Sequence, residues 1–322
     1  MNSNTSRIVL ALKPQESIDD IAQLLAQRFA GTSIELYLIS VLPNSLIGSA
    51  SDAHSRTTQS LLAALKKNAE RLRALDCVVR VQTQLAEGAV AEEINSYALR
   101  VKADAVLMHR TQQRGLLSSL GLTSVTRRVC QQASYPVEVL KLESKTENTA
   151  YRVLVPVTEE NLDYYPVEKL VEHPFPHGAC LRFLALLPPQ LGDDYAETSA
   201  IAAVRAVDTD SARSVRMESR LSKLCAALQE NLDPSIKVDY QLTRSGSSGA
   251  AIQECNRLNA DLLVMPNQTT DSFMQGSQPA LSPAAMLMAA RCSVLMLGHS
   301  LPRNFGKANR VLAMPNSHSH SS

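Results

Sequence analysis

A strand–loop–helix–strand unit occurs twice in the chain, and this repeat constrains the fold more than any other feature. The first copy spans Ala103–Val139, and a weaker second copy spans Ala260–Leu297. In the first copy a short apolar strand, Ala105–Met108, runs into a polar loop that contains glycines, and a helix then opens at Thr123–Ser124. Backbone N–H groups and the helix dipole converge after such a loop, so the unit is typical of anion or nucleotide pockets in α/β folds.

The repeat extends upstream of both copies, because apolar strands alternate there with amphipathic helices. Arg152–Val157 (RVLVPV) matches Arg7–Leu12, and Met265 then corresponds to Met108. Strands separated by helices need right-handed crossovers and form a parallel sheet. The pattern predicts helices at Ile18–Phe29, Thr58–Leu75, Val90–Lys102 and Ser211–Leu228, and strands at Ile34–Leu42, Val78–Leu85, Val137–Leu140, Ala179–Leu187, Ile236–Leu242 and Val294–Leu297.

The length of 322 residues indicates two domains, since a typical domain has about 150 residues. We place domain 1 at residues 1–142 and domain 2 at 152–298. Residues 143–151 are polar without periodicity and form the predicted linker, and the polar tail 299–322 is expected to be disordered. Residues 44–56 are predicted to be a loop, and the extra length between Leu187 and Ser211 is predicted to be a lid or an added helix.

Composition excludes several classes of function. A net charge of +1 and the absence of Trp argue against nucleic-acid binding, and no apolar run reaches the roughly 20 residues of a membrane span. The six cysteines show no CxxC or metal-like spacing, so they are interpreted as small buried residues of a reducing compartment. The start of the chain is predicted to be a strand rather than a signal peptide, and we expect a cytoplasmic protein.

The chain resembles the universal stress protein family, in particular its tandem two-domain members. The resemblance rests on the opening strand IVLAL, the element GAVAEEI before ADAVLM, and SVTRRVCQQASYPVEVL, with RVLVPV, GSSGAAI and ADLLVM in the second half. It implies two Rossmann-like domains of the adenine nucleotide alpha hydrolase-like kind, each a five-stranded parallel sheet between helices. It also implies dimerisation through the last strand of each domain, so we expect an internal pseudo-dimer through Val137–Leu140 and Val294–Leu297, with a homodimer left open.

Members of this family divide into ATP- or AMP-binding and non-binding types, and the binding motif is altered here. The binding type has an Asp at the end of the first strand, where this chain has Lys13 and Thr158 in its two halves. The first glycine of the family loop falls at His109 and Pro266. Glycine allows a close approach to phosphate, which His and Pro resist, so we expect the second site to be inactive towards ATP and the first to be altered.

The candidate nucleotide pocket of domain 1 combines positions carried over from the family with polar residues of the loop. Each has a structural alternative: Thr123 and Ser124 can simply cap a helix, Lys13 can pair with a core carboxylate, and the loop cations can be solvated. The candidate residues are Leu12, Lys13, Val41, Gly88, Met108, His109, Arg110, Arg114, Gly115, Thr123 and Ser124.

No metal site and no catalytic constellation are predicted, because the sequence lacks HExxH, GxSxG and P-loop motifs. The predicted function is therefore a non-enzymatic cytoplasmic stress-response or regulatory protein that binds an unknown protein partner or small ligand. An ATP- or AMP-binding protein that uses the altered loop of domain 1 is the first alternative. A nucleotide hydrolase or transferase is the second.

Overall fold

The computed structural model describes residues 5–13, 18–43, 51–109, 124–141, 150–162, 165, 167–188, 200–244, 248–266 and 283–298. The first half holds β1 (Ser6–Ala11), α1 (Asp19–Arg28), β2 (Ile34–Pro43), α2 (Ser51–Arg73), β3 (Val78–Gly88), α3 (Val90–Val101), β4 (Ala105–His109), α4 (Ser124–Gln132) and β5 (Val137–Leu140). The second half holds β6 (Arg152–Val157), α5 (Glu159–Leu162), α6 (Val167–Glu172), β7 (Cys180–Leu187), α7 (Ala200–Asn231), β8 (Lys237–Arg244), α8 (Ser248–Arg257), β9 (Leu262–Pro266), α10 (Pro283–Ala289) and β10 (Ser293–Leu297).

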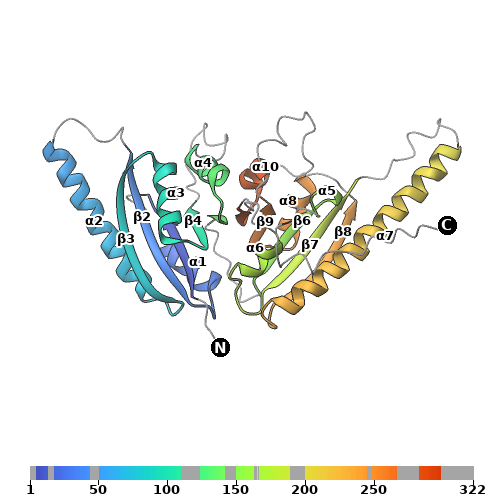
Figure 1. Ribbon diagram of the computed structural model, residues 1–322, viewed down its shortest axis with the longest axis horizontal. Coiled ribbons are helices and arrows are strands. Elements are labelled where there is room, and N and C mark those ends of the chain that lie inside the picture. Colours follow the sequence, from blue (N-terminus) through green and yellow to red (C-terminus); the bar gives the residue numbers. More distant parts are fainter. Residues whose placement is uncertain are drawn as a thin grey trace, which may run out of the picture.

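The ten described strands form one sheet in the order β3-β2-β1-β4-β5-β10-β9-β6-β7-β8. Within each half the neighbouring strands are parallel, and β5 and β10 meet antiparallel at the centre. Figure 1 shows the two halves side by side, with the long helices α2 and α7 at opposite ends. The predicted α/β fold and the predicted pairing of the two last strands are both confirmed.

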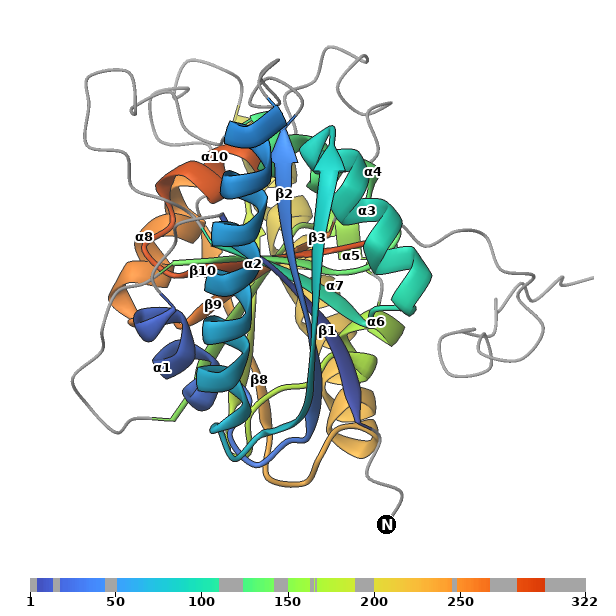
Figure 2. The same cartoon turned by 90° about the vertical axis from the view of Figure 1, so that its left-hand side faces the viewer.

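Helices cover both faces of the sheet because the strand residues are apolar on both sides. Alternate residues of β1 divide between the faces: Ile8 and Leu10 pack with α1 and α2, whereas Val9 packs with α3. In Figure 2, α1 and α3 lie on opposite sides of the strands of the first half. The second half repeats this arrangement, with α6 and α7 on one face and α8 and α10 on the other.

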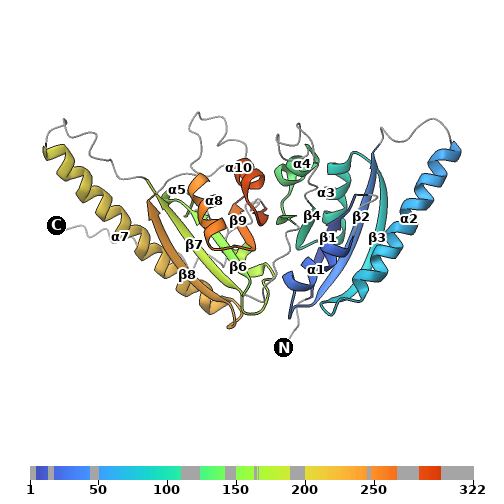
Figure 3. The ribbon, with the colours of Figure 1, turned by 180° about the vertical axis from the view of Figure 1, so that it is seen from behind.

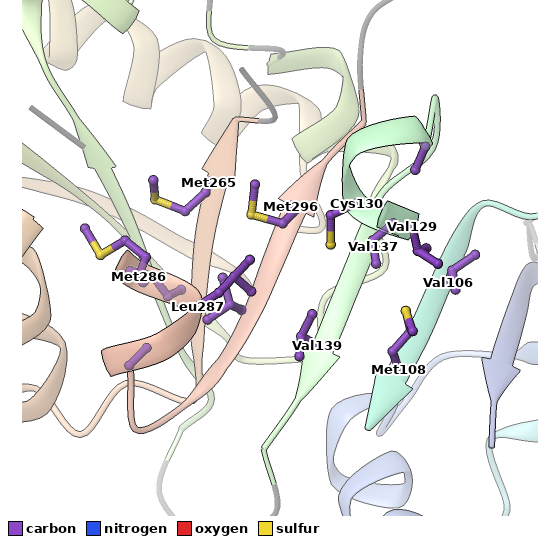
Figure 4. Close-up of a cluster of buried hydrophobic side chains, with 14 of the residues drawn as sticks. Val106, Met108, Val129, Cys130, Val137, Val139, Met265, Met286, Leu287 and Met296 are labelled. Carbon is purple, nitrogen blue, oxygen red and sulfur yellow. The ribbon is translucent and has the colours of Figure 1, made fainter. Parts of the chain in front are cut away.

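The two faces of the sheet differ at the β5–β10 seam. On the face of α3, α4, α8 and α10, one apolar core runs without interruption from one half into the other. Figure 4 shows its methionines on both sides of the seam, including Met108, Met265, Met286 and Met296. Methionine is flexible and fills irregular gaps, which suits a contact between two non-identical halves. On the opposite face the two halves keep separate cores.

Two helices begin well before the residues that the sequence pattern predicted. Residues 51–56 were expected in a loop but begin α2, and α7 starts at Ala200 instead of Ser211. Ser and Asp are common at helix starts, and the Ala-rich segment after residue 199 favours helix, so in each case helix-forming residues extend the amphipathic segment towards the N-terminus. In Figure 3, α2 and α7 extend along the two outer ends of the molecule. The predicted linker and tail lie almost entirely outside the described residues.

Candidate functional site

The strand order of the first half reverses between β1 and β4, and parallel α/β sheets bind ligands at the carboxyl ends of strands at such a point. β1 and β4 are in register, with Ala11 beside Met108. Lys13 therefore follows one strand and His109 ends the other at the same edge of the sheet. Both side chains are accessible to solvent: Lys13 is exposed and His109 is half-buried. Lys13 is thus exposed rather than partly buried, and its pairing with a core carboxylate stays a prediction.

Three further described candidates, Leu12, Val41 and Met108, lie beneath this edge of the sheet. Leu12 continues the β1–β2 ladder, because its N–H donates to the carbonyl of Ile39 at 2.9 Å. Leu12, Val41 and Met108 are buried and belong to the cores beneath the edge. They are apolar residues beneath this edge, whereas Lys13 and His109 are polar residues at it.

Gly88 lies where β3 ends and the chain turns into α3. Its φ of +145° is a conformation that favours glycine, and an added Cβ would lie 3.2 Å from Oε1 of Glu93. Gly88 is therefore required for the turn whether or not a ligand binds. Ser124 is the first residue of α4, as predicted. Arg110, Arg114, Gly115 and Thr123 lie outside the described residues.

The equivalent edge of the second half has a different use for its polar atoms. Thr158 follows β6, and its Oγ1 accepts the N–H of Asn161 at 3.3 Å while Oδ1 of Asn161 accepts the N–H of Thr158 at 2.7 Å. The Thr158 carbonyl also accepts the N–H of Leu162 at 3.1 Å. This reciprocal cap commits the backbone N–H, hydroxyl and carbonyl groups of Thr158 to the first turn of α5.

Tyr165 occupies the place where β6 and β9 stop pairing. The ladder between these strands holds two register pairs, Val153–Leu262 and Leu154–Leu263, whereas β1 and β4 share four. The Tyr165 hydroxyl donates to the next carbonyl of β9, that of Val264, at 3.2 Å. Burial raises the pKa of this phenol well above its usual value, so it stays a donor. The ring is buried in the core that contains residues of β6, β7 and β9.

A buried polar cluster crosses the seam on the face where the two apolar cores are separate. Arg28 at the end of α1 pairs with Glu138 on β5, with 3.2 Å between Nε and Oε2, and both side chains are 1% exposed or less. The same guanidinium donates to the carbonyl of Pro174 at 2.5 Å and contacts Nε2 of His173, both in the second half. The ring of Phe175 lies 5.8 Å from the guanidinium carbon and covers it.

Burial and charge define the protonation of this cluster. Burial, and then the Arg28 charge, hold the pKa of His173 well below its usual value, so the imidazole is neutral. Its Nε2 accepts from Arg28, which places the proton on Nδ1, and Nδ1 has no hydrogen-bond partner among the described residues. Burial raises the pKa of Glu138, while the charge and hydrogen bond of Arg28 oppose that rise. Arg28 is thus the central group of the cluster.

Sequence reasoning did not identify Arg28, Glu138, His173 or Tyr165. One signal was available for Glu138, which interrupts the apolar strand Val137–Leu140 with a charge, and a charge inside a central strand needs a buried partner. His173 belongs to the segment HPFPHG, whose two prolines cannot continue a helix and so indicate only where a helix ends. Tyr165 gave no signal, because its position depends on how two distant strands diverge.

The comparisons with known proteins agree with this architecture. Residues 4–141 match the profile of the Universal stress protein family. The first half of the chain belongs to the universal stress protein family. A universal stress protein of Methanocaldococcus jannaschii is 38% identical over 87 residues, which are 27% of this chain and 48% of that protein. The match thus spans about half the length of this curated relative.

Solved universal stress proteins extend the likeness to the whole chain. One from Archaeoglobus fulgidus superimposes with a TM-score of 0.56 and 14% identity, over 91% of this chain and 96% of its own. A putative universal stress protein from Pseudomonas aeruginosa gives a TM-score of 0.51 and 16% identity, over 92% and 94% of the two chains. At such identities the likeness shows the fold alone, which is a universal stress protein fold in both halves.

Two absences hold for the residues that the structure describes. No described helix is long and apolar enough to cross a membrane. No group of three or more His, Cys, Asp and Glu side chains within the described ranges could hold a metal ion.

Proposed function

We propose that this chain is a non-enzymatic stress-response or regulatory protein that binds a small ligand or a protein partner at the carboxyl edge of β1 and β4. The difference between its two halves carries this proposal. Lys13 and His109 lie at the edge of the first half, whereas the Thr158–Asn161 cap and the Tyr165 ring use the equivalent region of the second half for internal contacts. Binding is therefore assigned to the first half.

The residues at this edge favour an anionic ligand. Lys13 contributes a positive charge, and the imidazole of His109 can donate a hydrogen bond. The helix α4 begins at Ser124, and helix N-termini stabilise anions. Lys13 replaces the adenine-facing Asp of nucleotide-binding relatives, so we propose that the ligand differs from ATP or that ATP binds weakly.

Two alternatives assign a different ligand or activity to the same edge. In the first, ATP or AMP binds through the altered loop, with its phosphates near His109 and the α4 N-terminus. In the second, the protein hydrolyses a nucleotide or transfers a group from it, which needs a general base. The absence of a recognisable acid–base set in the sequence supports the non-enzymatic proposal. We also propose a cytoplasmic location, which the scattered, mostly buried cysteines support.

Titration of the purified chain with ATP, AMP and inorganic phosphate, followed by thermal unfolding, tests the proposal. A ligand at a hundredfold excess over its dissociation constant stabilises the folded state by about 2.7 kcal/mol. Lys13→Ala and His109→Ala should reduce this effect, while Lys67→Ala, which removes an exposed charge from α2, should preserve it.

Each outcome separates the proposals. If no nucleotide or phosphate raises the unfolding temperature, the anion site is rejected and only a protein partner remains. A nucleotide that stays bound through purification contradicts a function limited to protein partners. ATP turnover that is lost in both Ser124→Ala and His109→Ala would establish the enzyme alternative.

A further inference from the structure

Two buried cysteines of the second half lie in contact. Cys255 on α8 and Cys292 in the turn before β10 have their Sγ atoms 3.2 Å apart. Cys255 is 2% exposed and Cys292 is 9% exposed. A disulfide has an S–S distance of about 2.05 Å, so closing the pair requires a movement of about 1.2 Å, which is within the reach of side-chain rotation.

The surroundings distinguish this pair from other buried thiols. The thiol of Cys225 donates to the carbonyl of Asp239 at 3.7 Å, and it lies in the core on the other face of the sheet. Counted from Met265 against Met108, the positions that correspond to Cys255 and Cys292 in the first half are Ala98 and Tyr135. The fold therefore does not require two sulfurs at these positions.

The pair is better suited to oxidation than to metal binding. Within the described ranges no third His, Cys, Asp or Glu side chain completes a metal-binding group. Two thiols alone can instead be oxidised to a disulfide. Cys292 has the greater exposure, and it directly follows the exposed Arg291, so an oxidant reaches it before Cys255.

We propose that Cys255 and Cys292 form a redox modification site that a hydroperoxide oxidises to a disulfide. The Cys292 thiolate attacks the outer peroxide oxygen, the O–O bond breaks, and the alcohol or water leaves with the proton of that thiol, which gives a sulfenic acid. The Cys255 sulfur then attacks the Cys292 sulfur, and the hydroxyl group leaves as water with the Cys255 proton. Two thiols and one hydroperoxide thus give one disulfide, one water and one alcohol or second water.

The disulfide would join α8 to the start of the strand at the seam. It closes a sequence separation of 37 residues, and a cross-link of this length restricts the unfolded chain. It also ties β10, which pairs with β5 of the first half, to a helix of the second half. Oxidation should therefore raise the unfolding temperature of the chain, by roughly 5 °C.

Peptide mapping of the full chain tests this site directly. The chain is treated with hydrogen peroxide, alkylated and digested with trypsin. Arg244, Arg257, Arg291 and Arg303 place the two cysteines in separate peptides, 245–257 and 292–303, each with one cysteine. We expect a cross-linked product of these two peptides that dithiothreitol separates.

The variants and the controls decide the assignment. Cys255→Ala should abolish both the cross-link and the oxidation-dependent rise in unfolding temperature, and Cys225→Ala should keep both. The proposal is overturned if peroxide converts Cys292 only to sulfinic or sulfonic acid in the wild-type chain, or if Cys292 pairs with another cysteine. A cross-link without any rise in unfolding temperature contradicts the proposal that the disulfide stabilises the chain by joining α8 to the start of β10. These outcomes are measured on the wild-type chain, so they can be decided even if a variant does not fold.

Discussion

Arg28 and Glu138 form a buried ion pair that links α1 to the central strand β5, with 3.2 Å between Nε and Oε2. Glu138 lies opposite Leu295 in the antiparallel register of the seam, so one strand brings a charge to this point and the other brings an apolar side chain. Counted from Arg152 against Arg7, His173 is the residue of the second half that corresponds to Arg28. The seam is therefore pseudo-symmetric in backbone and asymmetric in charge.

This asymmetry predicts different costs for single and paired substitutions. Glu138→Leu leaves the Arg28 charge buried without a carboxylate, and it should lower the free energy of unfolding by about 3–5 kcal/mol. Arg28→Met leaves the Glu138 carboxylate buried without its partner, and it should lower the free energy of unfolding by a similar amount. The double variant removes both charges, so it should lose less than either single variant. Urea unfolding of the three proteins measures this, and a double variant that loses the sum of the two would contradict the ion pair.

The neutral state of His173 predicts a pH dependence. Its pKa in the folded chain is depressed, so the stability that it contributes is present above the unfolded value of about 6.5 and is lost as pH falls towards the folded value. Below pH 6.5 the unfolding free energy should fall by up to about 1.4 kcal/mol per pH unit on account of this one group. His173→Gln should remove that slope while keeping an acceptor for Arg28.

His177→Gln provides the matched control for the pH experiment. The His177 side chain is 60% exposed, beside Asp233, so the variant should retain the wild-type slope. Urea unfolding between pH 5.5 and 7.5, a window set about the ordinary histidine pKa, gives the comparison. An unchanged slope in His173→Gln would show that His173 does not resist protonation. The pKa of Glu138 is raised, so its own contribution has the opposite sign and is common to both variants.

Strands and amphipathic helices could be predicted from the sequence because their signals are local. Val137–Leu140 and Arg152–Val157 were predicted with the observed bounds, and the pairing of the last strands was implied by the family resemblance. The contacts of Arg28 and Tyr165 could not be predicted, since they depend on how distant segments meet in three dimensions. Sequence likewise could not show that Lys13 is exposed, because a residue type does not specify its environment.

Tyr165 provides a test of the closed edge in the second half. Tyr165→Phe keeps the ring but removes the donor to Val264, and it leaves a buried carbonyl without that partner. We expect a loss of about 1–3 kcal/mol in the free energy of unfolding. Tyr240→Phe on the edge strand β8, where the side chain is half-buried, should cost less. Equal losses in the two variants would argue against a structural role for the Tyr165 hydroxyl.

Gly298 tests how closely the two halves approach at the seam. A Cβ at this position would lie 2.5 Å from backbone atoms of Ser134 and Tyr135 in the first half, and a backbone cannot move aside as a flexible side chain can. Gly298→Ala should therefore force the end of β10 away from β5 and cost about 1–3 kcal/mol in urea unfolding. Met288→Ala on α10, where the side chain is 42% exposed, should stay within about 0.5 kcal/mol of the wild type. If Gly298→Ala proves as mild as Met288→Ala, the halves do not approach each other as closely as this backbone contact requires.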